Sequence, residues 1–92
     1  MKQQNKNNGL MDKTLNLTIV SPEGVLFEGK VKSLLLPGVM GLFAVMPLHA
    51  PIITQLTQGV ITFYEKEHKQ EIVIKSGFVE VKQNVVSVCV EQ

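Results

Sequence analysis

Apolar and polar residues alternate with a period of two along most of the chain, which predicts half-buried strands. Residues 15–19 show the strictest alternation. The other expected strands are 25–29, 30–36, 42–46, 60–64, 71–75, 78–82 and 85–90. Turn-forming residues separate these segments every ~6–12 positions, and no window favours a long amphipathic helix. We therefore predict an all-β fold of about eight to ten short strands, arranged as a sandwich or a barrel.

Several of these strands are apolar on both faces. In strand 60–64, Ile61 and Phe63 take one side while Val60 and Tyr64 take the other. Strand 85–90 also carries apolar residues on both sides. A sandwich needs only one inward face per sheet. The second apolar face predicts either contact with another protein or a tightly closed barrel.

The segment 36–51 holds three of the four prolines of the chain and differs from the strands around it. Pro37 followed by Gly38 predicts a type II turn, in which the glycine adopts a positive φ. The two later prolines restrict the residues before them to extended conformations. We therefore expect His49 to lie in a short loop that is held at both ends.

The tip of this predicted turn is unusually apolar, because it carries Val39 and Met40 with Leu42 just behind. Burial of such side chains stabilises by about 1.5–3 kcal/mol each relative to exposure. The overall composition agrees, since 45% of the 92 residues are hydrophobic in a chain too short for a large core. Both observations predict that a partner covers part of the surface.

Residues 1–10 are polar, with too few apolar side chains to offset the entropy of ordering. We expect residues 1–13 to be a disordered N-terminal extension and residues 14–92 to form a single domain. Met11 is an alternative start. The chain shows neither a signal-peptide core nor an apolar run long enough to span a membrane, so a soluble cytoplasmic protein is expected.

Charge and chemistry exclude several classes of function. The net charge is +1 and arginine is absent, which argues against a nucleotide or nucleic-acid groove. A single cysteine excludes an internal disulfide framework, and we expect Cys89 to be a small core residue. His49 has no nucleophile or acid near it in the sequence, and His68 belongs to a charged hairpin tip. We therefore predict no catalytic, cofactor-binding or metal-binding residue.

The central segment and the strands after it resemble the ε subunit of the F1 sector of ATP synthase. That family shows a Pro-Gly-x-x-Gly turn, then Pro-Gly-His-Ala-Pro with an aliphatic pair and threonine, then a Gly-x-x-Glu-Val strand. The matching positions are Pro37, Gly38, Gly41, Pro47, His49, Ala50, Pro51, Ile52, Ile53, Thr54, Gly59 and Gly77 through Val81. The order and spacing of these motifs make the resemblance specific over the whole foldable part of the chain.

The resemblance implies a β-sandwich of two five-stranded sheets. It also implies a non-catalytic rotor subunit that clamps the γ subunit and rests on the c-ring within an α/β/γ/ε assembly. Such a subunit is peripheral, on the cytoplasmic face of the bacterial plasma membrane, and couples proton flow to ATP synthesis. By residue-by-residue transfer, Ser21, His49 and Thr54 would face γ. The turn that would face the c-ring comprises Gly38, Val39, Met40, Gly41 and Leu42.

Two departures from the family pattern affect these expectations. Leu48 stands where the family usually has glycine, so a positive φ at this position would be strained. Most family members also continue into a C-terminal helical hairpin that brakes ATP hydrolysis and in some members binds ATP. Because this sequence ends at Gln92, we expect neither the brake nor an ATP site.

Two other classes of function stay open at this stage. A biotinyl or lipoyl carrier domain is also a small β-sandwich and would display a lysine at a hairpin tip, where Lys66 and Lys69 lie. The Met-Lys-Met context of carriers is absent here. A small enzyme built on a Cys89–His49 pair is the third possibility.

Overall fold

The computed structural model describes residues 14–92 and contains nine strands and no helix in that range. The strands are β1 (Leu15–Ser21), β2 (Gly24–Val31), β3 (Leu34–Gly38), β4 (Gly41–Val45), β5 (Ile52–Leu56), β6 (Gly59–Glu65), β7 (His68–Ile74), β8 (Ser76–Lys82) and β9 (Val85–Glu91). The extension expected at residues 1–13 lies outside the described residues.

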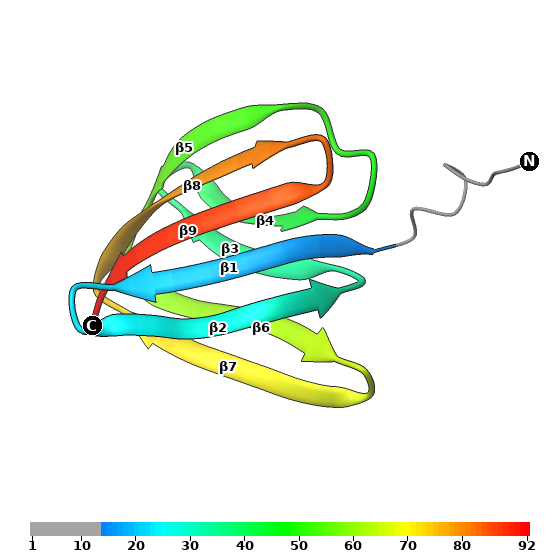
Figure 1. The fold of residues 1–92 in the computed structure, drawn as a ribbon. Coiled ribbons are helices and arrows are strands. Elements are labelled where there is room, and N and C mark those ends of the chain that lie inside the picture. Colours follow the sequence, from blue (N-terminus) through cyan, green and yellow to red (C-terminus); the bar gives the residue numbers. More distant parts are fainter. Residues whose placement is uncertain (1–13) are drawn as a thin grey trace, which may run out of the picture.

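The strands form two facing layers (Figure 1). One layer has the order β2-β1-β9-β8-β5, and the other has the order β4-β3-β6-β7. A single residue pair, Gly38 with Leu56, joins β3 to β5 and makes the two layers one continuous sheet. Within residues 14–92, the β1–β9 pair is parallel and every other strand pair is antiparallel. The predicted all-β sandwich is confirmed, although the layers hold five and four strands where two five-stranded sheets were expected.

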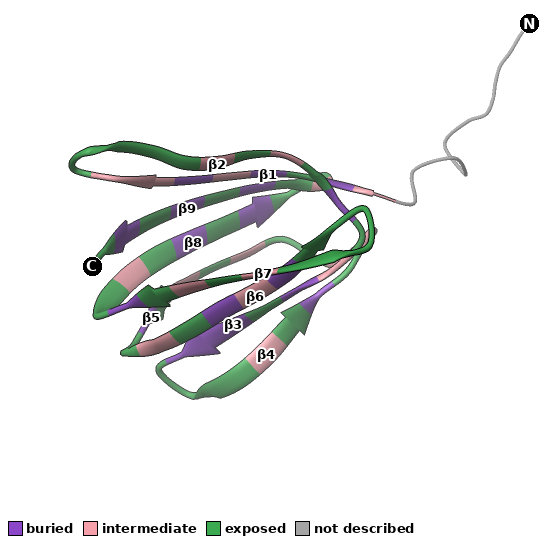
Figure 2. Ribbon diagram, turned by 90° about the horizontal axis from the view of Figure 1, so that it is seen from below, coloured by how far each residue is buried: buried purple, intermediate pink, exposed green. Residues whose placement is uncertain are grey.

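The core lies between the layers and follows the predicted alternation. Figure 2 shows buried and exposed residues alternating along the strands. In β9 the buried residues are Val86, Val88 and Val90. From the other layer, Phe63 packs against Phe27 of β2 with ring centroids 4.5 Å apart. The outward residues of several strands are apolar as predicted, and they include Val60, Tyr64 and Val85.

The expected strands did not include β5, and one of them spanned a break in the chain. Residues 30–36 were expected to form one strand, but β2 continues to Val31 and β3 begins at Leu34. The physical reason is topological, because β2 belongs to the five-stranded layer and β3 to the other layer. The chain therefore has to cross between the layers here, and the break at residues 32–33 provides the crossing.

Candidate functional site

The apolar turn between β3 and β4 consists of Val39 and Met40, two positions later than the turn expected at Pro37 and Gly38. Pro37 and Gly38 are the last residues of β3, and the glycine with a positive φ, 129°, is Gly41. The glycine at position 38 has a different role, because a Cβ there would lie 2.9 Å from the ring of Phe43. Close packing, rather than turn geometry, requires glycine at this position.

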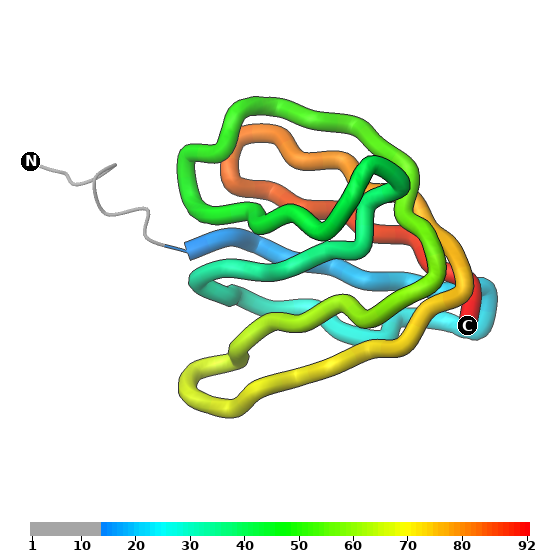
Figure 3. The backbone as a smooth tube through the Cα atoms, turned by 180° about the vertical axis from the view of Figure 1, so that it is seen from behind, coloured from blue at the N-terminus to red at the C-terminus, as the bar shows by residue number. Residues whose placement is uncertain are grey.

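The turn is both exposed and firmly held. Met40 is 94% exposed, Leu42 68% and Val39 52%. Two backbone hydrogen bonds tie its base to the adjoining segment: Val39 N–H donates to the Gln55 carbonyl (3.2 Å) and Thr57 N–H to the Pro37 carbonyl (2.8 Å). Figure 3 shows the turn beside β5. The chain thus presents apolar side chains to solvent on a fixed backbone.

Two open hollows flank this turn. One, of about 370 Å³, is lined by Met40, Leu42, His49 and Thr54 together with neighbouring residues of β3 and β4. The structure therefore brings two of the expected γ-facing residues together with the expected ring-facing turn. Members of the two sets, which were separate in the sequence-based prediction, thus line one hollow.

The third expected γ-facing residue, Ser21, lies apart from His49 and Thr54. It lines the other hollow, of about 610 Å³, to which Val39 also contributes. Its hydroxyl makes local contacts in the β1–β2 turn: Oγ accepts the Glu23 N–H and donates to the Glu23 carboxylate, each at 3.2 Å. Ser21 therefore stabilises a turn in the isolated chain.

His49 occupies the predicted loop between β4 and β5. The loop is closed by a hydrogen bond from His49 N–H to the Met46 carbonyl (3.0 Å). The imidazole Nδ1 lies 2.7 Å from the Ala50 carbonyl oxygen. Because a carbonyl only accepts, Nδ1 is the donor, and the ring is oriented by its own backbone.

Leu48 has a φ of 71°, so the strain expected from its departure from glycine is present. A left-handed conformation costs an L-residue about 1–2 kcal/mol. The side chain is 82% exposed, so burial does not offset this cost. Instead, Leu48 N–H donates to Asn84 Oδ1 at 2.7 Å. Sequence reasoning missed Asn84 as a partner of this loop, because no local pattern links residues 36 positions apart.

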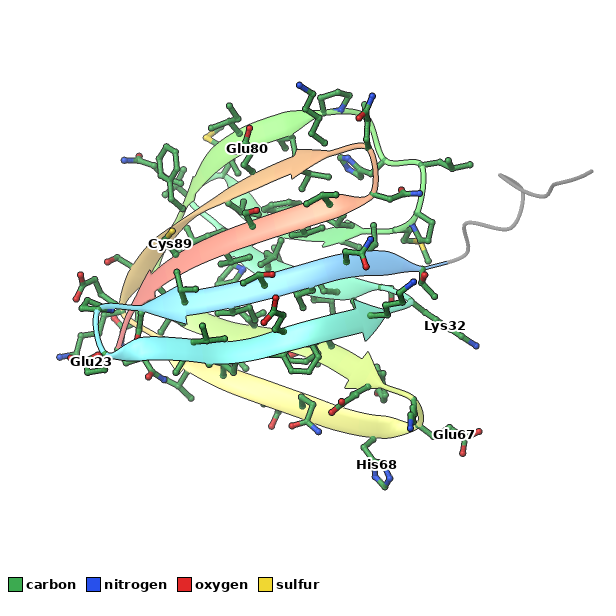
Figure 4. All side chains as sticks on the ribbon, in the orientation of Figure 1. Glu23, Lys32, Glu67, His68, Glu80 and Cys89 are labelled. Carbon is green, nitrogen blue, oxygen red and sulfur yellow. The ribbon has the colours of Figure 1, made fainter. Side chains whose placement is uncertain are left out.

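Cys89 is exposed, so the prediction of a core cysteine was wrong. Along β9 the valines at alternate positions point inward, and position 89 therefore points outward beside Phe78, its partner on β8. Figure 4 shows its sulfur on the outer side of the layer. Cys89 and His49 line different hollows, so the structure gives no support to a Cys–His pair.

The predicted hairpin is present at the β6–β7 turn, but of the two candidate carrier lysines only Lys66 lies in the turn, whereas Lys69 belongs to β7. Lys66 follows β6, and Lys69 lies 3.6 Å from Glu71 in an exposed ion pair of the kind that contributes little to stability. Figure 4 places Glu67 and His68 at this tip, far from Cys89. In the described part of the chain, no group of three or more His, Cys, Asp or Glu residues could hold a metal ion. The same residues include no helix with the length and apolarity to cross a membrane.

Comparison with known proteins identifies relatives along nearly all of the described chain. Residues 14–92 match the model of the ATP synthase delta/epsilon chain β-sandwich domain. The ATP synthase epsilon chain of Leptospira borgpetersenii is 42% identical over 74 residues, covering 80% of this chain and 58% of the relative. That of Nitratiruptor sp. is 46% identical over 79 residues, covering 85% and 61%. The chain thus spans about three fifths of the length of these relatives.

Two solved assemblies contain chains of the same fold. One is the Euglena gracilis mitochondrial ATP synthase, OSCP/F1/c-ring, with a TM-score of 0.82 at 18% identity, covering 94% of this chain and 64% of that one. The other is the central stalk and c-ring of the Tetrahymena thermophila mitochondrial ATP synthase, with a TM-score of 0.71 at 12% identity, covering 85% and 63%. At such identities the likeness concerns the fold, whereas the domain match and the closer epsilon chains define the family. This chain belongs to the ATP synthase delta/epsilon chain family, of which it contains the β-sandwich domain.

Proposed function

We propose that this chain is a central-stalk subunit of a proton-translocating F-type ATP synthase, which binds γ and contacts the c-ring. In this role it transmits torque and performs no catalysis itself. The observation that carries the proposal is the exposed turn at Val39 and Met40, which projects from a β-sandwich of the epsilon family. The two structural neighbours come from an OSCP/F1/c-ring assembly and from a central stalk with its c-ring, which supports the same role.

The turn suits contact with the c-ring for two physical reasons. Its backbone is fixed by hydrogen bonds to Gln55 and Thr57, so docking costs little conformational entropy. Its side chains are apolar and exposed, so their burial against the ring stabilises the complex. We therefore expect this chain's ring loops to present apolar side chains.

The hollow beside the turn suits the γ subunit. His49 and Thr54 line it with Leu42, so one protein segment inserted there would contact the loop and the turn together. Ser21 would contact γ only through a second, separate part of the surface. The close-packed interior between the two layers deforms little, which a torque-transmitting subunit requires. The complex would lie peripherally on the cytoplasmic face of the bacterial plasma membrane.

Affinity purification tests this proposal. The chain would be tagged at its N-terminus, expressed in its own organism, and recovered from gently solubilised membranes. We expect α, β, γ and c subunits to be recovered with it, and the Met40→Asp variant to recover less of the c subunit. Recovery of the chain alone would refute the proposal. Mass spectrometry of the intact chain tests the carrier alternative, because a carrier gains the mass of a biotinyl or lipoyl group on Lys66 or Lys69. We expect no such gain in mass.

A further inference from the structure

Two residues with positive φ meet at the edge of the proposed γ surface. Leu48 has a φ of 71° and Asn84 a φ of 63°. One hydrogen bond, from Leu48 N–H to Asn84 Oδ1, joins them at 2.7 Å. It connects the His49 loop with the β8–β9 turn, which is formed from a different part of the chain.

The backbone of Asn84 is fixed independently of its side chain. Gln83 and Asn84 form a two-residue hairpin loop with φ values of 51° and 63°, as in a type I′ turn. The Asn84 carbonyl also accepts the Asn16 N–H at 2.8 Å. Neither feature involves Oδ1, so the side-chain amide serves only the contact with Leu48 among the described hydrogen bonds.

The loop, by contrast, depends on an external constraint. Its backbone is strained at Leu48, and the side chain of Leu48 is exposed, so burial does not offset the cost of the strain. Among the described residues, two hydrogen bonds lie inside the loop, and both involve His49: its N–H donates to the Met46 carbonyl and its Nδ1 to the Ala50 carbonyl. The bond to Asn84 orients the Leu48 amide and therefore favours the left-handed conformation over the relaxed alternatives.

We infer that Asn84 is a positioning residue, which holds the 46–51 loop so that His49 and Leu48 are preorganised for docking. The inference rests on the proposed function, because γ is the partner that the loop would meet. Preorganisation matters in binding because a loop that must be ordered on contact lowers the affinity. The side chain of Asn84 thus acts on the γ surface through Leu48 and without touching γ itself.

The first part of the test needs no partner. Asn84→Gly removes Oδ1 but accepts a positive φ, and glycine is the favoured second residue of a type I′ turn. Asn84→Asp keeps an acceptor oxygen at the same place and tolerates the same backbone. In hydrogen exchange on the free 92-residue chain, we expect the Leu48 amide to lose protection in Asn84→Gly and to keep it in Asn84→Asp. Equal protection in Asn84→Gly and the wild type would overturn the inference.

The second part measures affinity for a γ-containing α/β/γ complex from the same organism. Loss of one neutral hydrogen bond that orders the loop should weaken binding about 5-fold in Asn84→Gly. Asn84→Asp should bind as the wild type does, and so should Gln83→Gly, a matched change at the neighbouring turn residue. All variants should retain the wild-type melting temperature within a few degrees.

The outcomes separate the two proposals. Loss of Leu48 protection with unchanged affinity would overturn the positioning role and leave the proposed function intact. Failure of the wild-type chain to bind the complex would refute the proposed function and the docking role together. Equal weakening by Gln83→Gly would also overturn the inference, because a general disturbance of the hairpin would then explain the effect.

Discussion

Replacement of Met40 by aspartate tests whether the apolar turn is an interface. In the free chain the side chain is 94% exposed, and position 40 lies in a turn where aspartate is well tolerated. The substitution should therefore change the free energy of unfolding by no more than about 0.5 kcal/mol. The fold should survive, with a melting temperature within about 4 °C of the wild type.

The effect on the complex is expected to be much larger. A methionine buried on docking contributes about 1.5–3 kcal/mol, which the variant forfeits. This loss alone raises the dissociation constant about 10- to 150-fold. A carboxylate without a cationic partner in an apolar contact adds a desolvation cost, so the true effect lies towards or beyond the upper end.

The assay is binding of the purified chain to a γ–c-ring rotor reconstituted in nanodiscs, with melting of each free variant measured in parallel. Met40→Leu is the matched apolar control and should bind within about threefold of the wild type, since it conserves most of the volume. His68→Asp adds a carboxylate at the distant β6–β7 hairpin and should also bind normally. If Met40→Asp binds as the wild type does while melting normally, the turn is not buried in the rotor and the reasoning fails.

Three further predictions concern the fold itself. In Gly77→Ala the new Cβ would lie 2.7 Å from the Cys89 carbonyl oxygen, so we expect the free energy of unfolding in urea to fall by about 1–3 kcal/mol. Ser76→Ala, a change at the exposed neighbouring residue, is the near-neutral control. Equal stability of the two variants would contradict this packing. Phe63→Ala removes a 2% exposed ring that packs at a tilt against Phe27 and should cost about 3–5 kcal/mol in the free energy of unfolding. A cost below about 1 kcal/mol would mean that the layers do not meet there. The exposed Cys89 thiol should react completely with Ellman's reagent in the native chain, whereas a reaction that requires denaturant would show that it is buried.

Most of the fold could be predicted because its main determinant is local. The period-two alternation identified the strands other than β5, and the turn residues between them identified the hairpins. The local sequence did not determine the position of the turn between β3 and β4, because Gly38 and Gly41 are both suitable turn glycines. Tertiary contacts decide between them: Gly38 pairs with Leu56 and packs against Phe43, which leaves the positive φ to Gly41.

The candidate site was predictable only in part. The exposed apolar tip followed from composition at Val39 and Met40, and the strain at Leu48 followed from the departure from the family pattern. The hydrogen bond between Leu48 and Asn84 did not follow, because it depends on how two distant turns come together in space. The orientation of Cys89 was readable from the alternation in β9, but the usual preference of cysteine for burial favoured the wrong interpretation.

Photo-crosslinking from defined positions in the assembled enzyme tests most directly whether the Val39–Met40 turn meets the c-ring and the His49 loop meets γ. A benzoylphenylalanine residue would replace Met40, His49 or His68 in turn, and the crosslinked subunits would be identified by mass spectrometry. We expect crosslinks to c subunits from position 40, to γ from position 49, and to neither from position 68. Crosslinks to the rotor from position 68, with none from position 40, would contradict this expectation.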